Sequence, residues 1–273
     1  MNPAVQTAQA ARTGQAVLPA PLLEIRNLHR RFGGLDAVKD LSLSLEEGTI
    51  RGIIGPNGAG KTTLFNLISG TFPPSSGEIF FRGEEITGEP PHRIAARGIL
   101  RTFQALKLSR SLSVLDNVLL GCHTRGTAGF FQGLLGLPRG RREEKRLALE
   151  AMAVMEELDI ARYASVPAGS LPFGIQRTVE LARALAAGPK LLLLDEPASG
   201  LNMKETDLLA DQIRKIRNRG LTVLLVEHDM TLVMDICDSI TVLNFGQLIA
   251  SGTPGEIQKN PDVLSIYLGE EDA

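Results

Sequence analysis

The chain has 273 residues, a formal net charge of −2 at pH 7 and 43% hydrophobic residues. Such a chain can bury the core of one large α/β domain with an inserted segment, and its intermixed charges argue against a basic face that binds nucleic acid. The two cysteines, Cys122 and Cys237, show neither metal-site spacing nor the density of a secreted disulfide framework, which favours small buried thiols in a reducing cytosol.

The first 21 residues are rich in Ala, Gln and Pro and lack the apolar centre of a secretory signal. We expect a disordered tail over residues 1–21. A transit peptide is the weaker alternative, because the stretch has no acidic residue but only one Arg and no Ser. No apolar run approaches the ~20 residues that cross a bilayer. If the protein serves a membrane, another chain must cross it.

Residues 22–45 place short apolar runs on either side of a Gly33-Gly34 turn, which predicts antiparallel strands. Leu41, Leu43 and Leu45 recur with a period of two, as in a half-buried strand. Residues 50–54 predict a continuous apolar strand. A Gly-rich turn follows it, and then a helix over about 61–69 that Gly70 ends.

The turn between this strand and this helix matches the phosphate-binding loop pattern. Its residues are Gly55, Pro56, Asn57, Gly58, Ala59, Gly60, Lys61, Thr62 and Thr63. The glycines let consecutive backbone N–H groups face phosphate oxygens at a helix N-terminus. Lys61 is placed to neutralise the β and γ phosphates, and the Thr62 hydroxyl to bind Mg²⁺. A Gly-rich turn with a chance Lys-Thr is the weaker alternative, because the strand–helix setting is the one that the motif requires.

Beyond this loop, residues of about 106–166 become helical in pattern, with Leu147, Met152, Met155 and Leu158 on one helix face. We expect an inserted helical subdomain there. Helices are then predicted over about 172–187 and 204–219, with an all-apolar strand over 191–194 and a second apolar strand over 221–226. Such strands alternating with helices indicate a parallel sheet that is covered on both faces.

Acidic and polar residues follow two of these strands, at the sheet edge where open α/β sheets bind ligands. Asp195 is placed to bind Mg²⁺, and Glu196 to polarise an attacking water as a general base. His228 follows the next strand and can contact a γ-phosphate, and the amide of Gln104 can reach Mg²⁺ or water. Taken alone, paired acids after a strand are often only turn residues. A lone histidine at a strand end is more often a surface or core residue than a catalytic one. Gln104 by itself would not indicate a site.

Together with the segment Leu171-Pro172-Phe173-Gly174-Ile175, these elements resemble the ATP-binding subunits of ABC transporters over nearly the whole chain from Leu22. The resemblance implies ATP and Mg²⁺ as ligands. It implies a phosphate-loop (RecA-like), mainly parallel sheet core with an antiparallel β subdomain and an inserted helical subdomain, all within one domain of residues 22–273. It also implies that Phe32 stacks on adenine with Val38 beside it, that Gln104 is the Q-loop residue, and that His228 is the switch histidine.

Within this family the chain is most similar to ATPase subunits of the LivG type, from branched-chain amino acid importers. The similarity lies in four segments: residues 101–104, the long insert 124–142, the run 195–202 and the ending 260–269. Urea or amide importers and lipopolysaccharide-export ATPases are the close alternatives. The insert 124–142 is either a mobile surface loop or a docking patch for a membrane subunit.

The resemblance further implies two membrane permease subunits, an indirect periplasmic solute-binding protein, and a peripheral location on the cytoplasmic face of the inner membrane. Pro172, Phe173 and Ile175 depart from the family signature Leu-Ser-Gly-Gly-Gln, which leaves the Gly174 amide as the donor to the other chain's nucleotide. We therefore predict a heterodimer with a second ATPase subunit. Rival classes are a soluble ABC ATPase, which would usually carry two cassettes or a coiled-coil insert, and a module without turnover, which would lack Glu196 or His228.

Overall fold

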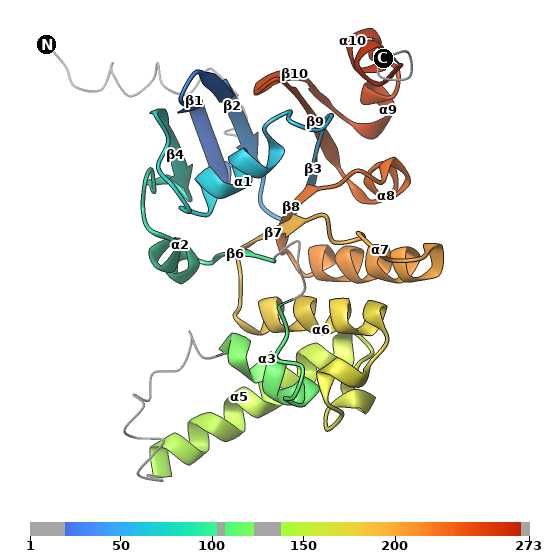
Figure 1. The fold of residues 1–273 in the computed structure, drawn as a ribbon. Coiled ribbons are helices and arrows are strands. Elements are labelled where there is room, and N and C mark those ends of the chain that lie inside the picture. Colours follow the sequence, from blue (N-terminus) through green and yellow to red (C-terminus); the bar gives the residue numbers. More distant parts are fainter. Residues whose placement is uncertain (1–19, 103–106, 123–137, 269–273) are drawn as a thin grey trace, which may run out of the picture.

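The computed structural model describes residues 20–102, 107–122 and 138–268, which form two sheets with surrounding helices (Figure 1). The strands are β1 (Leu23–Phe32), β2 (Leu35–Leu45), β3 (Ile50–Ile54), β4 (Ser76–Phe81), β5 (Glu84–Glu85), β6 (Ile99–Arg101), β7 (Leu191–Asp195), β8 (Thr222–Val226), β9 (Ser239–Asn244) and β10 (Gln247–Gly252). The α-helices are α1 (Lys61–Ile68), α2 (Pro91–Arg97), α3 (Val114–Cys122), α5 (Pro138–Glu157), α6 (Phe173–Ala186), α7 (Met203–Asn218), α8 (Met230–Ile236), α9 (Pro254–Ile257) and α10 (Pro261–Leu268).

The larger sheet has the strand order β10-β9-β3-β8-β7-β6. Its pairs are parallel except for β9–β10, which is antiparallel. Strands β7 and β8 are buried at every position, as expected for central strands with both faces covered. The smaller sheet, of order β2-β1-β4-β5, is wholly antiparallel, and Leu41, Leu43 and Leu45 of β2 are buried while their neighbours are exposed. These observations confirm the predicted fold class.

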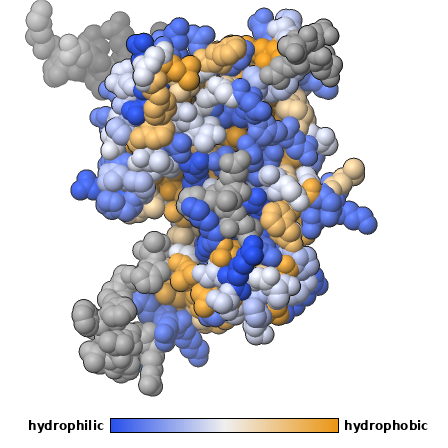
Figure 2. All heavy atoms as spheres, in the orientation of Figure 1, coloured by the Kyte–Doolittle hydropathy of each residue, from blue (hydrophilic) through white to orange (hydrophobic). Residues whose placement is uncertain are grey.

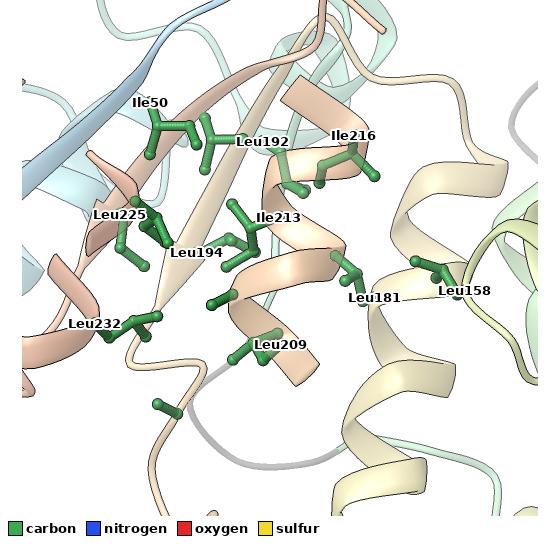
Figure 3. Packing of buried hydrophobic residues seen from close by; sticks show 14 of the residues in the cluster. Ile50, Leu158, Leu181, Leu192, Leu194, Leu209, Ile213, Ile216, Leu225 and Leu232 are labelled. Carbon is green, nitrogen blue, oxygen red and sulfur yellow. The ribbon is translucent and has the colours of Figure 1, made fainter. Parts of the chain in front are cut away.

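Alternate residues of the central strands face two different hydrophobic clusters. Leu191 and Leu193 pack with α1 and the antiparallel sheet, so α1 lies between the two sheets. Leu192 and Leu194 face the other cluster, where Figure 3 shows them beside Leu209, Ile213 and Ile216 of α7. Because every second strand side chain points to the same face, the alternation divides these leucines between the two clusters, while strand order and register decide which strand ends meet.

Helices α3, α5 and α6 pack against one another beyond α7, on the far side from the antiparallel sheet (Figure 1). The apolar face expected in this region is present: Met155 and Leu158 are buried, and Leu147 and Met152 pack partly buried against the same cluster. The last part of the predicted insert, from Pro138 on, is the start of α5, and residues 123–137 lie outside the described part of the chain. The division into a tail, a main domain and a helical subdomain stays a prediction.

The view in Figure 2 shows polar residues over most of this face, with apolar residues in several small groups among them. Among the helices of the described residues, none is both long enough and apolar enough to span a bilayer.

Candidate nucleotide-binding site

The phosphate-binding loop lies between β3 and α1 and curls around the end of its own lysine. Lys61 is buried, and its Nζ donates to the carbonyl oxygens of Gly55 at 2.5 Å and Pro56 at 2.8 Å. Gly60 has φ +102°, and a Cβ there would lie 2.4 Å from the Ala37 carbonyl oxygen. Only glycine therefore fits this close approach of the loop to β2. The loop is pre-shaped with its cation at the centre.

An open pocket of about 360 Å³ lies over this loop. Its lining is Phe32, Leu35, Asp36, Ala37, Asn57, Gly58, Ala59, Gly60, Lys61, Thr62, Thr63, Glu196, His228 and Phe245. Residues that are far apart in the sequence thus meet around one concave surface, with aromatic side chains among polar ones, as in ligand pockets generally. The predicted phosphate-loop residues 57–63 and the predicted hydrolytic residues Glu196 and His228 border it, whereas Gly55 and Pro56 do not.

Phe32, at the end of β1, presents a ring to this pocket and is 42% exposed. The ring packs edge to face against Phe72, with centroids 5.3 Å apart, and the Arg30 guanidinium lies 4.6 Å from its centroid. These contacts orient the ring while leaving part of it open for stacking. Val38 is different: its side chain is fully buried in the core and does not line the pocket, so the structure does not support the predicted contact with adenine.

Glu196 and His228 meet at the ends of the adjacent strands β7 and β8. His228 Nε2 lies 2.8 Å from Glu196 Oε1. Because Asp195 is in register with Val226, the residues that follow each strand are brought side by side. Glu196 has a left-handed backbone, with φ +48°, which is uncommon outside glycine and occurs often at functional sites. The pair can hold and polarise a water molecule at the pocket wall.

Asp195 is buried at the end of β7 and forms an ion pair with Arg101, whose Nη2 lies 2.5 Å from Asp195 Oδ2. Arg101 also donates to Asn66 Oδ1 of α1 at 2.6 Å, so it joins the edge strand β6 to the phosphate-loop helix. Thr62 is exposed on the pocket surface. A carboxylate and a hydroxyl are oxygen ligands suited to Mg²⁺. Gln104, the third predicted ligand, lies outside the described residues.

Gly174 lies away from this pocket, in the first turn of α6, whose N-cap is Pro172. It borders a separate small pocket with Leu201 and Glu205. The structure therefore does not bring Gly174 to this chain's own phosphate loop, which leaves its predicted donation to a second chain's nucleotide open.

Sequence reasoning missed several residues at this site, among them Arg101, Glu227 and Phe245. Arg101 pairs with Asp195, Glu227 is buried directly before His228, and Phe245 lines the pocket although it is 81% exposed. Phe245 sits in the turn between β9 and β10, where Gly246 N–H donates to the Ala59 carbonyl. The sequence did carry a signal for two of them. Phe245 is an aromatic residue directly before a glycine in a short turn, and Glu227 is a carboxylate directly before the histidine.

The sequence matches known protein families and curated proteins. The model for the ABC transporter family matches residues 38–199, and a model described as branched-chain amino acid ATP-binding cassette transporter matches residues 247–273. The high-affinity branched-chain amino acid transport ATP-binding protein BraF of Pseudomonas aeruginosa is 46% identical over 92% of this chain and 98% of its own length. LivG of Escherichia coli is 44% identical with the same coverage, and the lipopolysaccharide export system ATP-binding protein LptB of Haemophilus influenzae is 34% identical.

Solved structures show the same architecture. An ATP-binding cassette of an ABC transporter in its ADP conformation superposes with a TM-score of 0.80 at 30% identity, covering 91% of this chain and 99% of that chain. A nucleotide-free cassette gives a TM-score of 0.79 at 29% identity, with 90% and 98% covered. The chain therefore belongs to the ABC transporter family, as one of its ATP-hydrolysing, ATP-binding subunits.

Proposed function

We propose that this chain is the motor subunit of an importer for branched-chain or related hydrophobic amino acids. The observation that carries this proposal is the identity of 44–46% with BraF and LivG over 92% of the chain, together with the second family model at residues 247–273. The lower identity of 34% with LptB makes lipopolysaccharide export the weaker alternative, and a urea or amide importer remains the other.

ATP binding would place the adenine against Phe32, in the pocket that Phe245 also lines. The phosphates would lie on the backbone N–H groups between Gly55 and Thr63, where the N-terminus of α1 has no side-chain cap to compete for them. Lys61 would exchange its two carbonyl partners for β- and γ-phosphate oxygens.

Thr62, Asp195 and Gln104 would hold Mg²⁺. Bound there, Mg²⁺ would neutralise the charge that develops on the phosphates. Asp195 enters this role already paired with Arg101, which leaves the carboxylate in a fixed orientation at the end of β7.

Glu196 would accept a proton from the attacking water, and His228 would keep the Glu196 carboxylate and the γ-phosphate in line. The 2.8 Å contact between the two side chains supports this assignment. Hydrolysis would then release the contacts that a second ATPase subunit makes across the nucleotide.

In this proposal the chain forms a heterodimer with a different ATPase subunit and docks on two membrane permease subunits at the cytoplasmic face of the inner membrane. A periplasmic solute-binding protein delivers the amino acid from the other side. The altered signature at Pro172, Phe173 and Ile175 supports unequal nucleotide sites in such a dimer.

Uptake by cells lacking this chain tests the substrate class. We expect loss of ATP-dependent uptake of leucine, isoleucine and valine, restored by the wild-type chain and not by Glu196→Gln, with urea uptake unchanged. Loss of urea uptake with normal leucine uptake would favour the urea importer, and an envelope defect with both normal would favour lipopolysaccharide export.

A further inference from the structure

The Glu227 carboxylate is buried between the loops that follow β7 and β8, with 4% of the residue exposed. Its Oε1 accepts from the Ala198 backbone N–H at 2.7 Å. Its Oε2 accepts from the N–H groups of His228 at 2.9 Å and Asp229 at 3.3 Å. One carboxylate thus ties the loop that begins at Glu196 to the loop that carries His228.

Burying the Glu227 carboxylate lowers the stability of the folded chain. Burial raises the pKa of Glu227, and the described residues give the carboxylate backbone donors but no ion pair. A buried carboxylate without a counter-charge is expensive unless its oxygens accept hydrogen bonds, and here three backbone N–H donors fill three of about four lone-pair positions. An apolar side chain would fill the same space without this cost, so the position of the two loops is what the carboxylate provides.

The loops that Glu227 joins also contain the left-handed Glu196. The Glu196 N–H donates to Val226 O at 2.8 Å, and its carbonyl accepts from Ser199 N–H at 3.1 Å. Ala198 lies between Glu196 and Ser199 in the chain. A shift of the Ala198 N–H would therefore move the turn that orients the Glu196 side chain. His228 is the direct chain neighbour of Glu227, so the same carboxylate fixes the second member of the pair.

We propose that Glu227 is a positioning residue for hydrolysis: by holding Ala198 and His228 on its two oxygens, it fixes the 2.8 Å contact between Glu196 and His228. This inference rests on the proposed role of Glu196 as the base. Glu227 touches neither nucleotide nor water in this scheme. It acts only through the placement of Glu196 and His228.

Glu227→Gln tests this proposal, because the variant keeps the size but turns an NH₂ group toward backbone N–H donors. We expect kcat for ATP to fall about 10- to 100-fold, the range for a misplaced catalytic group, with equilibrium ATP binding unchanged. The melting temperature should also fall, because at least one buried N–H loses its acceptor, so both rates are measured well below it. Glu256→Gln is the matched control: Glu256 accepts from Thr253 N–H at 2.8 Å at the start of α9, away from the pocket, and its variant should keep wild-type turnover. Where Glu227→Gln does not fold, Glu227→Asp keeps the charge, shortens the reach and should give the same pattern.

A double-mutant cycle separates positioning from a general loss of stability. If Glu227 acts through Glu196, adding Glu227→Gln to Glu196→Gln will not lower the residual rate further. A further, multiplicative fall, or a loss of ATP binding in Glu227→Gln alone, overturns the proposal. Near-wild-type turnover in Glu196→Gln would instead overturn the base assignment, whereas wild-type turnover in Glu227→Gln with an inactive Glu196→Gln would overturn only the role of Glu227.

Discussion

Single residues at the pocket adopt conformations that their own preferences do not favour. Glu196 is left-handed although it has a Cβ, a conformation that costs about 1–3 kcal/mol and persists only where surrounding contacts fix it. Its backbone bonds to Val226 and Ser199 supply those contacts. Lys61 is similarly constrained, buried with its ammonium group on two loop carbonyls. The backbone of Glu196 and the side chain of Lys61 are therefore held in place before the nucleotide arrives.

Lys61→Ala removes the only loop cation and should weaken ATP binding itself. Charge-assisted bonds to phosphate contribute about 1.5–3 kcal/mol each, so we expect the Kd for ATP to rise about tenfold or more. Calorimetric titration measures this directly. Lys259→Ala, at an exposed residue after α9, is the control and should bind ATP normally. An unchanged Kd for Lys61→Ala would contradict the assignment of Lys61.

At the scale of elements, a capping box fixes the start of α7. Asn202 accepts from Glu205 N–H at 3.1 Å, while Glu205 Oε2 accepts from Asn202 N–H at 3.0 Å. Asn and Asp are both strong N-cap residues, so Asp at this position would preserve the start of the helix. Glu205 also lies against Gly174, where an added Cβ would come within 2.5 Å of Glu205 Oε1.

Asn202→Ala should therefore lower the free energy of unfolding by about 1 kcal/mol, since it removes one half of a capping box. Asn202→Asp should leave the stability close to that of the wild type. Denaturant unfolding followed by circular dichroism measures both variants. Equal stability of Asn202→Ala and the wild type would show that the box contributes nothing.

The elements that the sequence predicts well are those with strong local signals. Strands β3, β7 and β8 are mostly apolar because they are buried at all or nearly all positions, and the phosphate loop needs its glycines at fixed positions. Strand β6, of three residues, and the hairpin β9–β10 carry weaker patterns. Their places in the sheet depend on the pairing of β6 with β7 and of β9 with β3, which are distant in the sequence. The buried position of Val38 and the pairing of Arg101 with Asp195 likewise depend on tertiary contacts that local spacing does not encode.

For the whole molecule, the proposal places each nucleotide between the phosphate loop of one chain and the segment around Gly174 of another. In this chain Gly174 lies outside the pocket over the phosphate loop, so one chain supplies only half of such a site. A bulky substitution at Gly174 would also press on Glu205 and disturb the cap of α7. A loss of activity in such a variant would therefore not isolate a contact between chains. Adding the second ATPase subunit is the cleaner test.

We expect the purified chain to hydrolyse ATP slowly, because a homodimer would carry the altered signature at both sites. Adding the partner ATPase subunit should raise the rate severalfold, since its fuller signature completes the site of Lys61, Glu196 and His228. Steady-state hydrolysis at increasing partner concentration gives the result. Full activity of the chain alone, unchanged by the partner, would argue for a working homodimer.

The assignment of Glu196 as the base at this nucleotide site is tested most directly by Glu196→Gln, measured for ATP affinity and steady-state hydrolysis on the same preparation. The variant keeps the shape of the side chain and leaves Lys61, Thr62 and Asp195 in place, so ATP should bind as tightly as to the wild type. Turnover should fall by about 10²-fold or more, because the amide cannot accept the proton of the attacking water. Near-normal turnover with intact binding would contradict the account.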